Sequence, residues 1–330
     1  MMTFLKSTCL AAAVLATAGV ATADTLKVSH IRPQGATIDT ELRAFAETVS
    51  TATEGSLNLN LFPASALGDY TSVQERISVG AIDMAVQPAA TAVDRRMQIS
   101  AFPYVAANWA EAKAIYGPGG AIHGAMKDLY AKQDITMLAA YPVYFGGVAL
   151  HTDPVSPGDP LAAKGIKVRV PGIKSFQLTA DALGYISSPI PFSEAFTAVQ
   201  TGVVDGVVGS GAEGYYASFR DVTSAYVPVN THFEVWYMII NSGALAELSD
   251  SDRAALEAAA LEFEATRWTT AEADQSAFEQ KLADHGATIV SLSDEELAKT
   301  AAHVREQVWP QVLNDVGQEW GQSILDKIAQ

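Results

Sequence analysis

The sequence predicts a two-lobed α/β protein in which one long helix spans both lobes. Strand and helix patterns alternate as β-α-β-α-β over residues 26–86, an order typical of a parallel sheet covered by helices. A second series starts near Val148 and is followed by a turn-rich stretch at 153–160 (DPVSPGDP). Residues 250–284 are an almost unbroken run of helix formers. Such a helix would be about 50 Å long, more than the width of one small domain.

The first series is expected to contain three strands and two helices. Residues 26–30 (LKVSH) form the first strand, and a helix follows at 37–53. Residues 57–62 (LNLNLF) alternate apolar and polar side chains, as in a half-buried strand. A short helix at 73–79 then leads to a strand at 82–86 (IDMAV).

The second series continues this alternation. One helix is expected to have Ser193 as its N-cap and to end at Gly202. The long helix has Ser249 as its cap, and a capping box from Ser293 to Glu296 opens the last helix. The remaining expected elements are strands at 165–170, 203–208 and 235–241 and a helix at 175–183.

The N-terminal residues have the pattern of a secretory signal peptide. Lys6 precedes an apolar run at 9–20, and Ala21-Thr22-Ala23 supplies the small residues of a cleavage site. The run is too short and too Ala-rich to span a bilayer; the alternative is a buried N-terminal helix. We therefore expect a signal peptide at 1–23. In the mature chain we expect residues 24–146 with 234–275 to form domain I and residues 147–233 with 276–330 to form domain II.

The composition indicates an exported globular protein without thiols. Hydrophobic residues make up 49% and charged residues 18% of the chain, which excludes a disordered protein. The one cysteine, Cys9, lies in the signal peptide, so the mature chain has no disulfide and no Cys nucleophile. There are 21 basic and 37 acidic residues, a net charge of −16. Because such a surface repels phosphate backbones and anionic lipids, we expect neither nucleic-acid binding nor direct membrane insertion.

The motifs give little support to an enzyme. Residues 209–214 (GSGAEG) spell G-x-G-x-x-G after an apolar strand, and Glu234 follows at the distance of a ribose-binding acid. The motif lies two-thirds along an exported chain, however, and we interpret it as a loop that lets backbone approach a ligand. No metal-ligand spacing or nucleophile elbow is present in the sequence. We therefore expect a solute-binding protein with no catalytic residue, metal or cofactor. The alternative outside this class is a periplasmic hydrolase or lyase.

Four segments together resemble one family. Residues 165–171 (GIKVRVP) are similar to the G-[IL]-K-x-R-x-P motif of the extracytoplasmic receptors of tripartite ATP-independent periplasmic (TRAP) transporters. Residues 191–206 resemble that family's P-x-S-E-x-x-x-A-L-Q-x-G-x-V-D-G block. Residues 62–68 (FPASALG) with 79–85, and 102–104 (FPY), match further segments. The resemblance implies a bilobed, type II-like periplasmic-binding-protein fold with a ligand between the lobes.

The resemblance also implies ligand-binding residues. Arg169 matches the family's arginine that pairs with a substrate carboxylate, a geometry that a guanidinium fork suits; the alternative is a surface arginine at a strand end. Phe192 matches an aromatic that packs on the ligand, and its alternative is a hydrophobic contact at a helix start. Four other candidates could instead be solvated loop residues: Gln87, Tyr70, His30 and Arg32.

Two departures from the family pattern affect the site. Where well-known members carry an Asn, this chain has Gly209, and Glu213 is the nearest candidate to replace its contact. In the region where sialic-acid-binding members have a further arginine, this chain has residues 144–147 (YFGG), so sialic acid is not the expected ligand, and Tyr144 could supply a hydroxyl contact instead. Glu234 and Trp236 could supply acceptor and aromatic contacts, with a core position as the alternative for Trp236.

The sequence therefore predicts a periplasmic receptor rather than an enzyme. We expect it to bind a small hydroxylated organic acid such as a uronate or aldonate and to deliver it to the permease subunits of a TRAP transporter. A dicarboxylate, a 2-oxo acid and a hydroxysulfonate remain alternative ligands.

Overall fold

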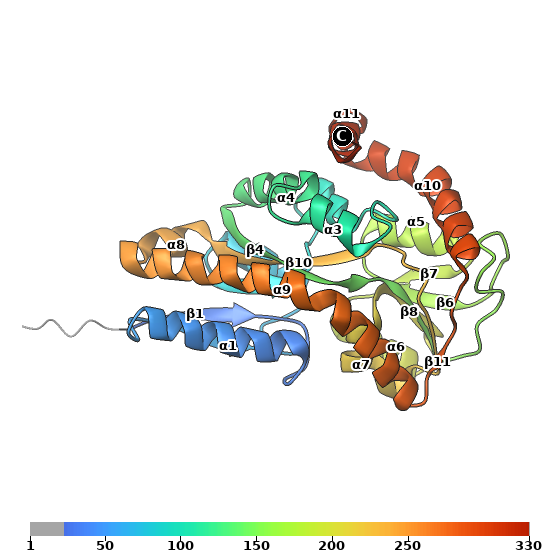
Figure 1. Ribbon diagram of the computed structural model, residues 1–330, viewed down its shortest axis with the longest axis horizontal. Coiled ribbons are helices and arrows are strands. Elements are labelled where there is room, and N and C mark those ends of the chain that lie inside the picture. Colours follow the sequence, from blue (N-terminus) through green and yellow to red (C-terminus); the bar gives the residue numbers. More distant parts are fainter. Residues whose placement is uncertain (1–22, 330) are drawn as a thin grey trace, which may run out of the picture.

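The computed structural model describes residues 23–329, so the predicted signal peptide lies outside the described residues except for Ala23. Two β-sheets carry the fold, and helices cover them (Figure 1). In chain order the elements are β1 (Asp24–Ser29), α1 (Thr37–Ala52), β2 (Leu57–Phe62), α2 (Tyr70–Ser78), β3 (Met84–Gln87), the 3₁₀ helix η1 (Arg95–Ala101), α3 (Trp109–Tyr116), α4 (Ala121–Ala131), β4 (Ile135–Phe145), β5 (Gly147–Leu150), β6 (Lys167–Val170), α5 (Lys174–Ala182), β7 (Ile186–Pro189), α6 (Phe192–Gln200), β8 (Gly206–Ser210), α7 (Ala212–Phe219), the 3₁₀ helix η2 (Arg220–Val222), β9 (Ala225–Val227), β10 (Phe233–Asn241), α8 (Ser242–Glu247), α9 (Asp250–Asp284), β11 (Thr288–Ile289), α10 (Asp294–Val316) and α11 (Gln318–Ile328).

The first sheet has the strand order β2-β1-β3-β10-β4. Strands β2 and β3 both pair parallel to β1, as the β-α-β-α-β pattern predicts. Helix α1 buries Ile38, Leu42, Phe45 and Val49, which recur every three or four residues and so form one face of the helix. Strand β10 is antiparallel to both β3 and β4 and completes the sheet from a distant part of the chain.

The second sheet has the strand order β11-β9-β5-β8-β6-β7. Strand β6 is parallel to its neighbours β7 and β8, whereas β5 is antiparallel to β8 and β9. Both sheets therefore combine a parallel part with antiparallel strands. This mixture agrees with the predicted α/β class.

Three connections join the two sheets. Only Gly146 separates β4 of the first sheet from β5 of the second, and residues 228–232 connect β9 to β10. The third connection is helix α9, which contacts α1 and β4 at one end and α7 and β11 at the other (Figure 1). The predicted spanning helix is thus confirmed with its Ser249 cap, whose hydroxyl accepts from the Asp252 amide.

The C-terminal helices lie along both halves of the molecule. The predicted capping box of Ser293 and Glu296 is present at the start of α10. Helix α10 packs against α5 and η1, and α11 packs against α4 (Figure 1). In residues 23–329, no helix is both long and apolar enough to cross a membrane.

Two predicted helix starts are wrong. Helix α2 begins at Tyr70, three residues before the predicted start, because the Asp69 carboxylate accepts from the Thr71 amide and caps the helix. Helix α6 begins at Phe192, with Pro191 rather than Ser193 at the N-cap position and no side-chain cap. Pro191 has the extended ψ of a cap residue, so Ser193 is already inside the first turn.

Candidate functional site

A cavity lies between the two sheets and is lined from both sides. Arg32, Tyr70, Tyr144, Glu234 and Trp236 come from the first-sheet side, and Arg169, Phe192 and Ser210 come from the second. The cavity has a volume of only about 30 Å³. The side chains therefore nearly meet, and a ligand of several carbon atoms requires the walls to move apart.

Arg169 on β6 offers a buried guanidinium to this cavity. Its residue is only 2% exposed, and its Nε donates to the Ile190 carbonyl at 2.8 Å. The Phe192 ring lies 5.7 Å from the guanidinium carbon. In the described part of the chain, no Asp or Glu forms an ion pair with Arg169, and burial lowers its pKa. A buried cation without a counter-charge is costly, so this arrangement favours an anionic ligand.

Arg32, in the loop after β1, is held from several sides. Its Nε donates to Glu213 Oε2 at 3.0 Å, and its Nη2 donates to Tyr144 Oη at 3.1 Å and to Ser210 Oγ at 3.3 Å. The guanidinium carbon lies 4.8 Å from the Trp236 ring. Burial alone would lower the pKa of Arg32, but the neighbouring Glu213 raises it above its ordinary value. Arg32 is therefore a paired cation, unlike Arg169.

Glu234 on β10 fixes two neighbouring rings. Its Oε1 accepts from the Trp236 indole at 2.6 Å, and its Oε2 lies 2.8 Å from His232 Nε2. His232 Nδ1 in turn lies 2.9 Å from Thr231 Oγ1. Because both carboxylate oxygens of Glu234 are engaged, its main effect is to set the position of the indole that forms one wall.

Tyr70 and Gln87 act as a connected pair, although only Tyr70 lines the cavity. Gln87, the last residue of β3, donates from Nε2 to the Tyr70 carbonyl at 2.7 Å. Burial raises the pKa of Tyr70, so its phenol is neutral at physiological pH. Gln87 therefore fixes the start of α2, and α2 places the Tyr70 ring.

His30 lies behind the cavity wall rather than in it. Its Nε2 is 3.2 Å from Asp39 Oδ1, and Asp39 also accepts from Arg43. Burial lowers the pKa of His30, an effect that Asp39 offsets only in part. His30 and Asp39 together hold the loop that carries Arg32.

Three glycines of the G-x-G-x-x-G motif shape the cavity and its surroundings. Gly209 lines it with φ of 100°, and a Cβ there would lie 2.6 Å from Pro171 Cδ. The Asn of the family motif would therefore be strained at this position. A Cβ at Gly211 would lie 2.5 Å from the Tyr144 ring, and one at Gly214 would lie 2.1 Å from Arg32 Nη2. Gly211 and Gly214 thus make room for side chains from the side of the first sheet.

Seven of the ten predicted site residues line the cavity: Arg169, Phe192, Tyr70, Tyr144, Trp236, Arg32 and Glu234. Gln87 and His30 lie behind it. Glu213 contacts Arg32 but faces a second cavity between α1 and α7, of about 680 Å³, whose lining also includes Gln34 and Lys281.

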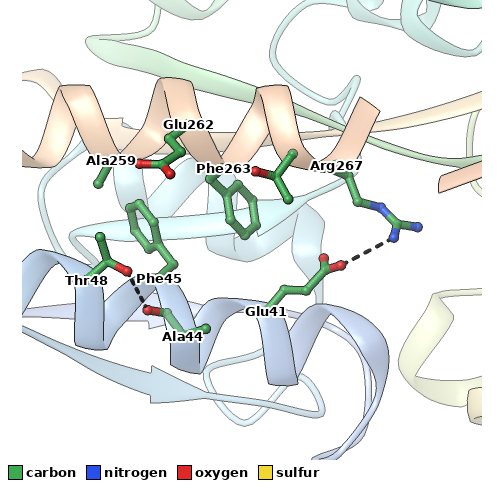
Figure 2. A pocket seen from close by; sticks show the side chains of 9 residues that line it. Glu41, Ala44, Phe45, Thr48, Ala259, Glu262, Phe263 and Arg267 are labelled. Atoms are coloured by element: carbon green, nitrogen blue, oxygen red, sulfur yellow. Dashed lines mark hydrogen bonds and ion pairs between the residues drawn. The ribbon is translucent and has the colours of Figure 1, made fainter. Parts of the chain in front are cut away.

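Another pocket lies between α1 and α9, on the side of the first sheet (Figure 2). Phe45 and Phe263 line it side by side, with ring centroids 5.4 Å apart, and Glu41 is paired with Arg267 at one end. None of the ten predicted residues lines this pocket. We therefore place the candidate site between the sheets.

The described residues show no group of three or more potential metal ligands close enough to hold an ion. The site offers one unpaired cation, aromatic walls and hydroxyl groups. This chemistry fits reversible binding of an anion.

A model of the family described as bacterial extracellular solute-binding protein, family 7, matches residues 28–314. The chain belongs to this family. Members of family 7 are substrate-binding receptors rather than enzymes, and the receptors of TRAP transporters work with membrane permease components. The resemblance to TRAP receptors is thereby confirmed.

Curated relatives cover most of the chain. A solute-binding protein of Roseobacter denitrificans is 29% identical over 257 residues, which is 77% of each chain. The C4-dicarboxylate-binding periplasmic protein DctP of Rhodobacter capsulatus is 26% identical over 304 residues, 91% of this chain and 87% of the relative.

Solved structures share the fold. A sugar acid binding protein of Advenella mimigardefordensis, in complex with galactonate, has a TM-score of 0.84 at 19% identity and covers 93% of this chain and 98% of its own. A Bordetella pertussis extracytoplasmic solute receptor that binds pyroglutamic acid has a TM-score of 0.83 at 22% identity, covering 93% and 100%. These two structures establish the bilobed fold.

Sequence reasoning missed several residues of the site. Ser210 lies inside the glycine motif and bonds both Arg32 and Tyr144, and its place between two glycines was the available signal. His232 lies two residues before Glu234, where the two side chains on one face of a strand can meet. Ile173 and Phe176 line the apolar wall, but nothing in their spacing distinguishes them from core residues.

Proposed function

We propose that this protein is the periplasmic receptor of a TRAP transporter and captures a small hydroxylated organic acid, such as a uronate or aldonate. The acid binds between the two lobes, with its carboxylate on Arg169, and is delivered to the membrane permease. The N-terminal signal pattern and the extracytoplasmic family support a periplasmic location.

The observation that carries this proposal is the state of Arg169. Its guanidinium is buried in the cavity without a carboxylate partner among the described residues. A ligand carboxylate would satisfy the planar fork through two charge-assisted hydrogen bonds. A nonpolar or cationic ligand would leave the buried charge uncompensated.

The ligands of related receptors support a carboxylate as the shared chemistry. Structural neighbours hold L-galactonate, L-gulonate, D-glucuronate, orotic acid or succinate, and each of these ligands carries a carboxyl group. Three of the five are sugar acids, which favours a hydroxylated ligand here.

The walls of the cavity suit a polyhydroxylated chain. Trp236 and Phe192 line the cavity, and their aromatic rings can pack against the C–H groups of a sugar acid. Tyr144 and Ser210 lie 2.8 Å apart and can exchange their mutual hydrogen bond for bonds to ligand hydroxyls. Tyr70 adds a neutral phenol on the side of α2.

Dicarboxylates, 2-oxo acids and hydroxysulfonates are the second candidates. The observation in favour of a dicarboxylate is the second guanidinium, Arg32, which also lines the cavity. Its ion pair with Glu213 weighs against this alternative, because a second carboxylate would have to compete with it.

We further propose that ligand entry requires the lobes to separate. In this proposal residues 24–146 with 234–275 move as domain I against residues 147–233 with 276–330 as domain II, and the three connections between the sheets form the hinge. The narrowness of the cavity supports this opening, since hinge closure around a ligand is the usual mode of two-lobed binding proteins.

A thermal-shift screen with organic acids tests the proposed function. A ligand at 100 times its Kd should raise the stability by about 2.7 kcal/mol and should be recovered unchanged. D-galactonate, D-glucuronate, succinate, pyruvate and isethionate represent the candidate classes. Stabilisation by galactose, which lacks the carboxylate, as strong as that by galactonate would contradict the role of Arg169.

A further inference from the structure

The guanidinium groups of Arg32 and Arg169 line the same cavity, but only that of Arg32 is paired with an acidic residue, Glu213, among the described residues. Arg169 has no ion pair among the described residues, whereas Arg32 is paired with Glu213 at 3.0 Å. Arg32 and Glu213 are 1% and 3% exposed, so solvent screens their interaction little. The pair joins the loop after β1 to the first turn of α7, across the two sheets.

Residues of the opposite lobe help to fix the position of the Arg32 guanidinium. Gly214 leaves the space that its Nη2 occupies, since a Cβ there would lie 2.1 Å from this atom. Ser210 of the opposite lobe and Tyr144 of the same lobe both accept from this nitrogen. The guanidinium is thus directed toward Glu213, and its Nε–Nη2 edge, which could otherwise bind a carboxylate, is already used.

Of the two arginines that line the cavity, Arg169 is the one without a carboxylate partner among the described residues. Arg32 and Glu213 neutralise each other, and the Glu234 carboxylate bonds His232 and Trp236 rather than either arginine. Arg169 remains as the cation that a ligand can pair with. This arrangement suits a ligand with one negative charge.

We infer that Glu213 is a specificity-determining residue that selects monoanions over dianions by occupying Arg32. The inference rests on the proposed function, because it assumes that a carboxylate binds Arg169. It also assigns Glu213 a role other than replacing the ligand contact of the family Asn: the residue lines the second cavity rather than the ligand cavity, and its Oε2 bonds Arg32.

Pairs of acids with the same carbon chain and either one or two carboxylates test this inference. Galactonate and galactarate share one hydroxylated chain with one or two carboxylates, and 2-hydroxybutanoate with malate, and butanoate with succinate, form shorter pairs. The readout is the ratio of the two Kd values within a pair, measured by calorimetry at pH 7.5. The wild type should bind the monoanion more tightly than the dianion.

Three variants separate charge from shape. Glu213→Gln keeps the size and an acceptor but removes the charge, and it should shift the ratio toward the dianion by at least about tenfold, or about 1.4 kcal/mol. The double variant Arg32→Gln with Glu213→Gln removes both charges and should return the ratio toward the wild-type value. Glu262→Gln, at an exposed position of α9 near the pocket in Figure 2, controls for the change in net charge and should leave the ratio unchanged. Melting curves confirm that each variant is folded.

The outcomes distinguish this inference from the proposed function. If the wild type binds no monocarboxylate of the three pairs, the proposed function is wrong, and the inference fails with it. If the wild type binds monocarboxylates but Glu213→Gln leaves the ratio unchanged, only the inference is wrong. A dianion bound by the wild type as tightly as its matched monoanion also overturns it. If Glu213→Gln does not fold, Glu213→Asp, which keeps the charge, should retain the wild-type ratio, and a shift toward the dianion would refute the charge argument.

Discussion

Replacing Arg169 by Ala should weaken ligand binding by about 2–5 kcal/mol, because the ligand carboxylate would lose a buried, charge-assisted partner. This corresponds to an increase in Kd of about 30-fold to several thousand-fold. The structure supports the upper part of this range, since Arg169 is 2% exposed and its one side-chain hydrogen bond to residues 23–329 uses Nε alone. The two terminal nitrogens are left for the ligand.

Arg169→Lys should weaken ligand binding nearly as much as Arg169→Ala does. A lysine ammonium keeps the charge but cannot form two parallel hydrogen bonds to a carboxylate. Isothermal titration calorimetry with the acid that stabilises the wild type most strongly provides the measurement. Binding by either variant within twofold of the wild type would refute the reasoning.

The same position allows a test on the unliganded protein. Arg169→Met fills a similar volume and removes a buried charge that lacks an ion pair. Its free energy of unfolding should therefore stay within about 1 kcal/mol of the wild-type value, the worth of the lost hydrogen bond to the Ile190 carbonyl, or exceed it. A large loss of stability in urea denaturation would mean that Arg169 has a structural role instead.

Three further changes test the surroundings of the site. Glu234→Ala should lower the stability by about 1–3 kcal/mol, because it leaves the buried Trp236 indole without an acceptor; chemical denaturation measures this, and an unchanged midpoint would contradict it. Gly214→Ala should reduce both the stability and the affinity because its Cβ meets a guanidinium, whereas Gly124→Ala in the open middle of α4 should be neutral or stabilise by up to about 1 kcal/mol. Comparable melting temperatures of the two alanine variants would argue against the tight fit. Burial lowers the pKa of His30 below its ordinary 6.5, so the unfolded chain binds a proton there at a higher pH than the folded chain does. The free energy of unfolding should therefore fall as the pH drops from 6.5 toward the folded pKa, by at most about 1.4 kcal/mol per pH unit. His30→Gln should flatten this dependence on pH, and an identical slope in the variant would refute the assignment.

Local signals predicted the elements of residues 24–87 and the spanning helix, but they gave no element between β3 and β5, and the strand expected at 203–208 begins only at Gly206. Helix α9 begins and ends where its cap and composition indicate, because Ser249 and the following run of helix formers act within a few residues of each other. The starts of α2 and α6 were missed for the same kind of reason: Asp69 and Pro191 fit the cap positions better than the residues chosen. Such errors of two or three residues arise because neighbouring residues are similarly suited to the N-cap position.

The site itself depends on contacts that no local pattern contains. The identity of Arg169 as a candidate came from a family motif, but its burial depends on both sheets. Arg32 meets Glu213 from 181 residues away, and the small size of Gly214 is explained only by this contact. Periodicity gives the face of a helix or strand, whereas the partner of that face is set by the arrangement of the two lobes.

A crystal structure with the best-binding acid from the screen tests the central claim most directly. Both terminal nitrogens of Arg169 should lie about 2.7–2.9 Å from the two oxygens of the ligand carboxylate, with Arg32 still bonded to Glu213. A ligand whose carboxylate pairs with Arg32, or lies away from residue 169, would contradict the account.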